Sequence, residues 1–195
     1  MDISEKLISL SKKLKNKRRY SKDLSRFYKL AREVSKKIPH ANNVGYHIEF
    51  LTNMHERGYF ELMADKPEGS IRPIGYKFNI NDSLRYAGDK VIRGVMAHEF
   101  SHSVYGMGLL LKGYEEEIGV HMYAIANGFS DDLIALNDFV DFQFKYHPHI
   151  RAKFQVFTNN EINEIKDTLE GMTLKEIVPM AKACYVNLKQ FHKIR

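Results

Sequence analysis

The chain contains a single cysteine, Cys184, among its 195 residues. One cysteine excludes an intramolecular disulfide, a CxxC zinc ribbon and a dithiol redox pair. No apolar run approaches the roughly 20 residues that a membrane-spanning helix requires. The N-terminus also lacks the apolar core and the small-residue cleavage site of a secretory signal. These absences predict a protein of the reducing cytoplasm without a membrane span.

Positive charge, in contrast, is abundant and concentrated at one end. Residues 1–39 contain thirteen Lys and Arg against four Asp and Glu, a local balance of +9, whereas the remaining 156 residues carry seventeen against twenty. A basic end of this kind is typical of contact with nucleic acid or an acidic membrane, although a solvated helix face has the same composition. The length and the apolar fraction of 44% suit one domain with a helical appendage.

Apolar spacing predicts two helices in the basic segment. The first has apolar residues at helical intervals: Ile3, Leu7, Leu10 and Leu14. The basic cluster 15–20 interrupts this helix, and Ser21 is suited to cap a second one, which Pro39 ends. We therefore divide the chain into a basic helical segment, 1–39, and a larger domain, 40–195.

The larger domain begins with strands and continues with helices. Three short runs rich in aromatic and branched residues predict a small, largely antiparallel sheet: 46–51, 59–63 and 74–80. Helices are expected at about 91–105, 115–127 and 131–145, and two more after the caps Asn160 and Thr173. Pro179 should break or kink the last helix. This order of elements indicates an α+β domain.

The most specific motif is His98-Glu99-Phe100-Ser101-His102, in the first of these later helices. Residues four apart project from the same helix face, so both imidazoles can bind one metal ion. Glu99 then lies on the adjoining flank, where it can deprotonate a water that the metal activates. The competing interpretation is a pair of core-edge histidines, but two imidazoles and an acid on a buried stripe are costly without a metal or hydrogen-bond partners.

A catalytic zinc site needs a third protein ligand and one open position. The pattern H-E-x-x-H-x-x-G-x-x-H would require glycine at position 105 and histidine at position 108. Those positions hold Tyr105 and Gly108, which excludes the metzincin arrangement. The third ligand is therefore expected on the following helix.

That helix begins with three consecutive glutamates, and Glu117 is the best candidate among them. It shares a helical face with His121 and with small or apolar residues, as a helix that approaches the first one closely would require. Glu116 is the alternative ligand, and an acidic first turn also complements the helix dipole without any metal. On the chosen face, His121 would lie beside the metal and hydrogen-bond one of its ligands.

Three features in this order resemble the minimal gluzincin metallopeptidases, HExxH zincin-like proteins such as the ImmA/IrrE-type and SprT-like peptidases. They are the strand end Ile80-Asn81-Asp82, the helix sequence Val-Met-Ala-His-Glu-Phe-Ser-His, and the run Glu117-Ile-Gly-Val-His-Met-Tyr-Ala. The resemblance covers about residues 70–140. The chain departs from the family at Val120-His121, where a small residue and Asp are usual. It also lacks the C-terminal CxxC ribbon of SprT-like proteins.

The resemblance implies a zincin-like fold and peptide-bond hydrolysis. Zn²⁺ would be bound by His98, His102 and Glu117, with Glu99 as the general base. A further donor should stabilise the oxyanion, and His121 is taken as the catalytic candidate. Other candidates for this role are Tyr123, Tyr146, His147 and His149. A peptide or protein substrate would add to the sheet edge along 74–80.

Two other interpretations remain open at this level. The first is a nucleic-acid-associated regulatory protein that binds through the helices of residues 1–39 and carries a vestigial or switch-like zinc site. The second is that residues 1–39 fold over the cleft as an inhibitory prosegment.

Overall fold

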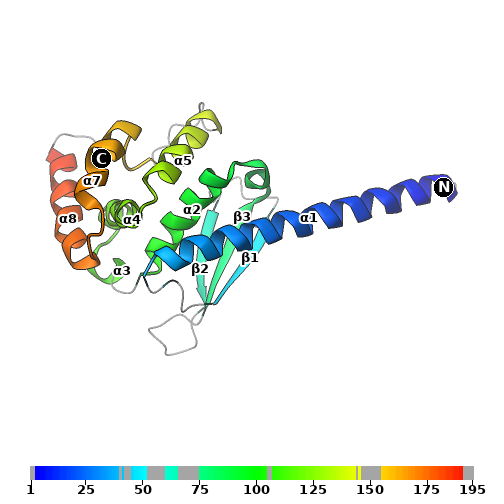
Figure 1. The fold of residues 1–195 in the computed structure, drawn as a ribbon, viewed down its shortest axis with the longest axis horizontal. Coiled ribbons are helices and arrows are strands. Elements are labelled where there is room, and N and C mark those ends of the chain that lie inside the picture. Colours follow the sequence, from blue (N-terminus) through cyan, green and yellow to red (C-terminus); the bar gives the residue numbers. More distant parts are fainter. Residues whose placement is uncertain are drawn as a thin grey trace.

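A computed structural model describes residues 3–39, 41, 45–51, 60–65, 75–104, 107–143, 145 and 155–190 of the chain. In chain order the elements are α1 (Ile3–Lys37), β1 (Gly45–Leu51), β2 (Phe60–Asp65), β3 (Gly75–Asn81), η2 (Asp82–Tyr86), α2 (Asp89–His102), α3 (Met107–Leu110), α4 (Tyr114–Ala126), α5 (Ser130–Gln143), α7 (Asn159–Leu169) and α8 (Leu174–Gln190). Helices and a small sheet together form the predicted α+β arrangement (Figure 1). Within the described part of the chain, no helix is both long and apolar enough to cross a membrane.

The basic N-terminal segment forms one continuous helix, so the prediction of two helices is wrong. α1 runs for 35 residues and passes through the 15–20 cluster without a break. Lysine and arginine are good helix formers, and neither proline nor glycine occurs within α1. The hydroxyl of Ser25 donates to the carbonyl of Ser21 at 2.9 Å, which is an interaction inside a helix and not an N-cap.

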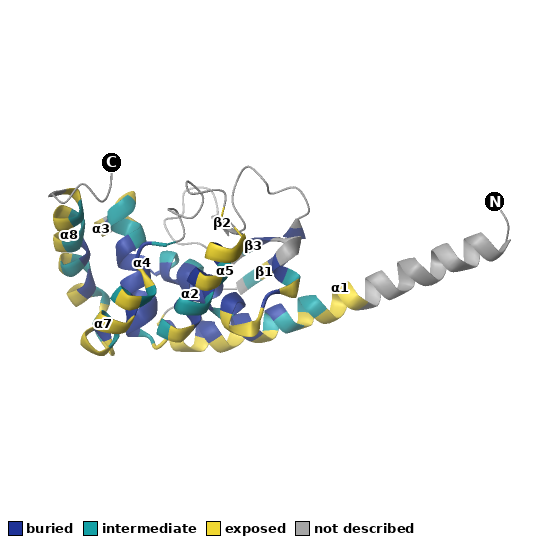
Figure 2. Cartoon of the chain, turned by 90° about the horizontal axis from the view of Figure 1, so that it is seen from above, coloured by how far each residue is buried: buried dark blue, intermediate teal, exposed yellow. Residues whose placement is uncertain are grey.

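The second half of α1 belongs to the core of the molecule. Its inward side chains, and that of Ile38 directly after the helix, are at most 3% exposed: Phe27, Leu30, Ala31, Val34 and Ile38. Figure 2 shows this buried side of α1 continuing into the buried surfaces of α2 and α4. Deleting residues 1–39 would remove five core side chains, which argues against a detachable inhibitory prosegment. The division of the chain at residue 39 stays a prediction.

The sheet is mixed, which corrects the prediction of a largely antiparallel sheet. The strand order is β1-β3-β2, with β2 antiparallel to β3 and β1 parallel to β3. The parallel pair arises because β3 inserts between the two strands that precede it in the chain, instead of extending a meander beyond β2. The predicted docking of substrate along 74–80 is consequently wrong, since β3 is paired on both sides and has no open edge.

Alternating residues give the sheet one apolar and one polar face. Four side chains of the apolar face are buried: Ile48, Phe50, Phe78 and Ile80. On the opposite face the ammonium group of Lys77 pairs with the carboxylate of Glu49 at 2.6 Å. α1 and α2 both cover the apolar face, where Phe100 packs edge-on against Phe78 with ring centroids 4.9 Å apart. The sheet thus provides the floor on which α2 is placed.

The C-terminal helices begin at side-chain caps. Thr158 caps α7, two residues before the predicted cap Asn160, through reciprocal hydrogen bonds with Glu161 at 3.2 and 2.8 Å. One half of the predicted capping box of α8 is present: the backbone N–H of Thr173 donates to the carboxylate of Glu176 at 2.8 Å, while the N–H of Glu176 donates to the backbone carbonyl of Thr173 at 3.1 Å. Pro179 lies inside α8 without ending it, since a proline removes only one intrahelical hydrogen bond.

Gly94 sets the distance between α2 and α5. A Cβ atom at this position would overlap the backbone carbonyl of Asp132, which lies in the first turn of α5. An ion pair between Arg93 and Asp132, at 3.0 Å, lies at the same crossing. The two helices therefore approach each other as closely as their backbones allow.

We predict that Gly94→Ala destabilises the protein although alanine is the better helix former. Backbone has to move to admit the methyl group, and overpacking of this kind costs about 1–3 kcal/mol. Thermal and denaturant unfolding measure the effect. Gly88→Ala is the matched control, because a Cβ there meets nothing within 4 Å; equal stability of the two variants would contradict the close helix contact.

Candidate metal centre

The HExxH motif lies at the C-terminal end of α2, on the side that faces α4. Phe100, in the middle of the motif, packs against Phe78 of the sheet. Residues two apart on a helix point in directions about 200° apart. His98 and His102 are therefore directed away from the sheet, and α2 ends at His102. The sheet contact thus decides which way the two imidazoles point.

Glu117, in the first turn of α4, reaches both imidazoles. Its Oε2 lies 3.4 Å from Nε2 of His98, and its Oε1 lies 3.7 Å from Nε2 of His102. The two Nε2 atoms are 3.2 Å apart. Three side chains from two helices therefore bring their donor atoms to one point.

This spacing matches what a tetrahedral metal ion imposes on its ligands. Zinc–ligand bonds of about 2.0–2.1 Å place neighbouring ligand atoms about 3.3 Å apart. The Nε2 atoms of His98 and His102 are 3.2 Å apart, and the shorter carboxylate distance is 3.4 Å. Without a cation, two imidazole nitrogens this close share at most one N–H···N hydrogen bond. The donor set therefore suits a shared cation.

His121 offers a second way to complete the donor set. Ligand atoms of His98, Glu117 and His121 lie within 4.8 Å of one another, so this cluster can hold a metal ion. The ring of His121 packs edge-on against that of His98, with centroids 4.7 Å apart. Its Nδ1 lies 3.0 Å from the backbone carbonyl of Glu117, where it acts as a donor. His102 and His121 are therefore both candidates for the third member of the set.

Glu116 supports His102 from the other side of the ring. Its Oε1 lies 3.0 Å from Nδ1 of His102, whereas Glu117 is near Nε2. A carboxylate in this position accepts a hydrogen bond from the N–H at Nδ1 and leaves Nε2 unprotonated for a metal ion. Gly108 leaves room for the carboxylate, since a Cβ there would come within 3.3 Å of Oε1 of Glu116. The two adjacent glutamates thus contact opposite nitrogens of one imidazole.

The carboxylates give the cluster a strongly negative electrostatic potential. Burial, followed by the neighbouring rings of His121 and His102, holds the pKa of His98 well below its ordinary value, so this imidazole is neutral. Burial opposes a charge on His102 as well, but hydrogen bonds to Glu116 and Glu117 outweigh it and raise the pKa of His102 to about 10. Without a metal ion, a proton on His102 supplies positive charge that compensates the carboxylates. A divalent cation would compensate them more fully.

Glu99 borders the same cluster. Its Oε1 lies 4.0 Å from Nε2 of His98, and its side chain is 12% exposed. The carboxylate thus lies beside the point where the donor atoms converge, farther away than Glu117.

Nδ1 of His98 is a buried polar atom with no hydrogen-bond partner among the described residues. An imidazole that binds a metal through Nε2 carries its proton on Nδ1, and metal-binding histidines usually donate that proton to an acceptor. His98 lacks this support, whereas His102 has it from Glu116. The two histidines of the motif are therefore held unequally.

Tyr123, another predicted oxyanion donor, is not brought to the cluster. It is two residues from His121, hence on the opposite side of α4, and it is buried there. The other predicted donors, Tyr146, His147 and His149, lie outside the described residues. Sequence reasoning missed the contact of Glu116 with Nδ1 of His102. The only signal for it is a glycine at 108, close before an acidic run.

No family model, curated protein or solved structure matches this chain. The geometry of the cluster is therefore the main basis for assigning a function.

We predict that the protein binds one divalent transition-metal ion per chain at this cluster. An ion that binds only the folded state stabilises it, by about 2.7 kcal/mol when its free concentration is a hundred times Kd. Elemental analysis of the purified protein, and thermal unfolding with and without added Zn²⁺, measure the two effects.

His98→Ala should abolish both the bound metal and the thermal shift. His47→Ala is the matched control, because His47 is an exposed histidine on β1 that lies outside the cluster. Comparing His102→Ala with His121→Ala decides which imidazole completes the site. Metal binding that survives in His98→Ala would contradict this location.

Proposed function

We propose that the chain is a zinc-dependent metallopeptidase of the gluzincin type. The observation that carries the proposal is the carboxylate of Glu117, which lies 3.4 and 3.7 Å from the Nε2 atoms of the two motif histidines. In this proposal His98, His102 and Glu117 bind the metal. The resemblance of the motifs to ImmA/IrrE-type and SprT-like peptidases supports the same assignment.

The donor set is the reason for choosing zinc. Two imidazole nitrogens and one carboxylate, close to tetrahedral spacing, are a ligand set typical of catalytic zinc, which keeps a fourth position for water. Zinc bound there would lower the pKa of its water towards neutrality and polarise a substrate carbonyl. The protein has to supply the proton transfer and the binding of substrate.

Glu99 is proposed as the general base. Its carboxylate lies 4.0 Å from Nε2 of His98, beside the donor atoms. From this position it would hold the attacking water, accept a proton from it, and deliver that proton to the leaving amine. Because its side chain is only 12% exposed, bulk water competes little for this carboxylate.

Glu116 and His121 are proposed as positioning residues of the same site. Glu116 holds His102 through Nδ1 at 3.0 Å. His121 packs against the ring of His98 and is held by the backbone of Glu117. If substrate comes within reach of its Nε2, His121 would also be the oxyanion donor that the sequence predicts.

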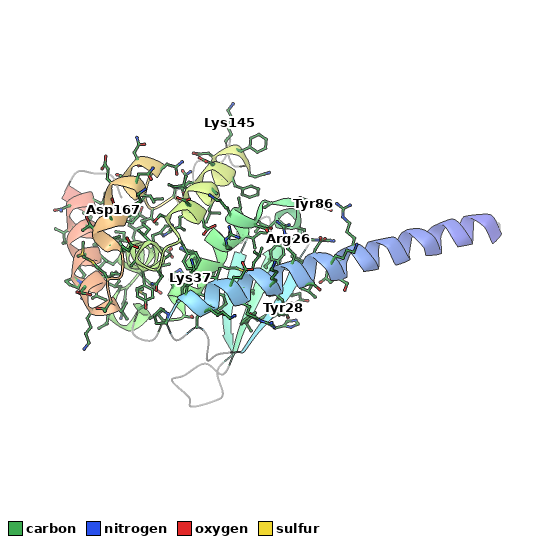
Figure 3. All side chains as sticks on the ribbon, in the orientation of Figure 1. Arg26, Tyr28, Lys37, Tyr86, Lys145 and Asp167 are labelled. Carbon is green, nitrogen blue, oxygen red and sulfur yellow. The ribbon has the colours of Figure 1, made fainter. Side chains whose placement is uncertain are left out.

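The proposed substrate is a peptide or protein bound as an added strand at the β2 edge. Among the described strands, β1 and β2 form the two edges of the sheet. The β1 edge is already used, because the backbone N–H of Ile48 donates to the hydroxyl of Tyr28 at 3.1 Å. Figure 3 shows Tyr28 directed from α1 towards β1. β2 therefore remains for β-augmentation.

A cytoplasmic location completes the proposal. Its support is the single cysteine, which suits a reducing compartment.

We predict that Glu99→Gln retains the metal and loses peptidase activity. Glutamine preserves the shape of the side chain but cannot accept a proton, and general-base catalysis contributes about a hundredfold to ten-thousandfold. Hydrolysis of an unfolded protein substrate and the zinc content are measured on the same preparation. Glu115→Gln is the matched control from the first turn of α4; full activity in Glu99→Gln would refute the assignment.

A second prediction separates the two adjacent glutamates. Glu117→Gln removes a charged ligand and should lose most of the bound zinc. Glu116→Gln removes only support for His102, and loss of such support lowers metal affinity by about ten- to a hundredfold. Competition titrations with a metal-sensitive chelator give both affinities, and the reverse order of effects would make Glu116 the ligand.

A further inference from the structure

The start of α2 is locked to α1 by two arginines. Arg85 donates to the carboxylate of Asp23 at 2.9 and 2.7 Å, and its side chain is 11% exposed. Arg26 donates to the carboxylate of Asp89 at 2.6 Å and to the carbonyl of Ala87 at 2.7 Å. These contacts fix η2 against α1 at the point where α1 leaves the body (Figure 1). We call the rigid surface formed here by η2 and the adjoining part of α1 the platform.

Two aromatic rings and the exposed guanidinium group of Arg19 lie together on this platform. Tyr86 is 63% exposed, and the guanidinium of Arg19 lies over its ring, 5.0 Å from the centroid. Tyr20 is 38% exposed and stacks in the same way with Arg85 at 5.3 Å. Figure 3 shows Tyr86 at the junction between η2 and α1. The platform thus presents one exposed cation–aromatic pair, Arg19 with Tyr86, together with the partly exposed ring of Tyr20, which also packs edge-on against Phe50.

The charge of the platform is positive. The two acidic residues, Asp23 and Asp89, are already paired with Arg85 and Arg26. Arg19 and Lys22 have no carboxylate partner among the described residues, and both are exposed. The sequence continues this basic character towards the N-terminus, within a segment that carries a net charge of +9 over residues 1–39.

We propose that this platform binds single-stranded nucleic acid. Exposed rings stack with bases irrespective of sequence, and flanking cations track the phosphates. An acidic protein would pair with the cations but would not stack on the planar faces of the tyrosines. An acidic membrane would favour a larger apolar surface than two tyrosines. The platform is rigid before binding, so little conformational entropy is lost on association. This inference does not depend on the proposed peptidase activity.

Fluorescence anisotropy of a labelled oligothymidylate, at a series of salt concentrations and with the full-length protein, tests the proposal. Tyr86→Ala should weaken binding about tenfold without changing the salt dependence, because stacking involves no counterion release. Arg19→Ala should weaken binding and reduce the slope of log K against log salt by about one. Both side chains are exposed, so the variants should unfold at the temperature of the wild type.

Phe142→Ala and Lys145→Ala are the matched controls, since they remove an exposed aromatic ring at the end of α5 and an exposed cation just after it, outside α1 and η2. Both should bind the oligonucleotide like the wild type. The proposal is overturned if Tyr86→Ala and Arg19→Ala leave oligothymidylate binding unchanged. It is also overturned if polyglutamate or vesicles with acidic lipids bind more tightly than the oligonucleotide and depend equally on Tyr86.

Discussion

The packing of α2 against the sheet is the contact on which the other features depend. Phe100 enters the apolar face of the sheet, and the geometry of a helix then turns His98 and His102 towards α4. The other side of α2 is held equally firmly, because the absence of a side chain at Gly94 lets α5 approach to backbone contact. A rotation of α2 about its axis would disturb both contacts at once. The direction of the imidazoles is therefore set by apolar packing and not by the polar cluster itself.

The polar cluster, in turn, contains more negative charge than its own side chains neutralise. Carboxylates of Glu99, Glu116 and Glu117 surround two largely buried imidazoles. Partly buried carboxylates this close together favour a positive charge among them, because the repulsion between them is weakly screened. The raised pKa of His102, about 10, is one expression of this preference. A cluster of His98, Glu117 and His121 that could hold a metal ion lies at the same place.

The parts of the site that follow from local spacing could be predicted from the sequence. The four-residue spacing of His98 and His102 fixes their common face, and the helical face shared by Glu117 and His121 predicts that Glu117 faces these histidines. The structure brings the carboxylate of Glu117 to both imidazoles. The contact of Glu116 with the far side of His102 depends on the path of the chain through α3, which no local pattern encodes.

The misjudged elements of the fold have the same explanation. A run of like charges predicts an interruption of the N-terminal helix, but lysine and arginine favour a helix and α1 continues through them. The place of β3 between β1 and β2 is not encoded in the local pattern of any one strand. Strand order is a long-range property, and three short strands with similar composition are compatible with several orders.

Because α1 is uninterrupted, its N-terminal part extends from the body over a fixed length. Sixteen residues separate the first turn of the helix from Arg19, and at 1.5 Å per residue they span about 24 Å. The N-terminus is thus displayed on a semi-rigid arm whose direction is set by the anchored half of the helix. The start of α1 is therefore held at a defined distance from the sheet, because no break in the helix separates it from the anchored half.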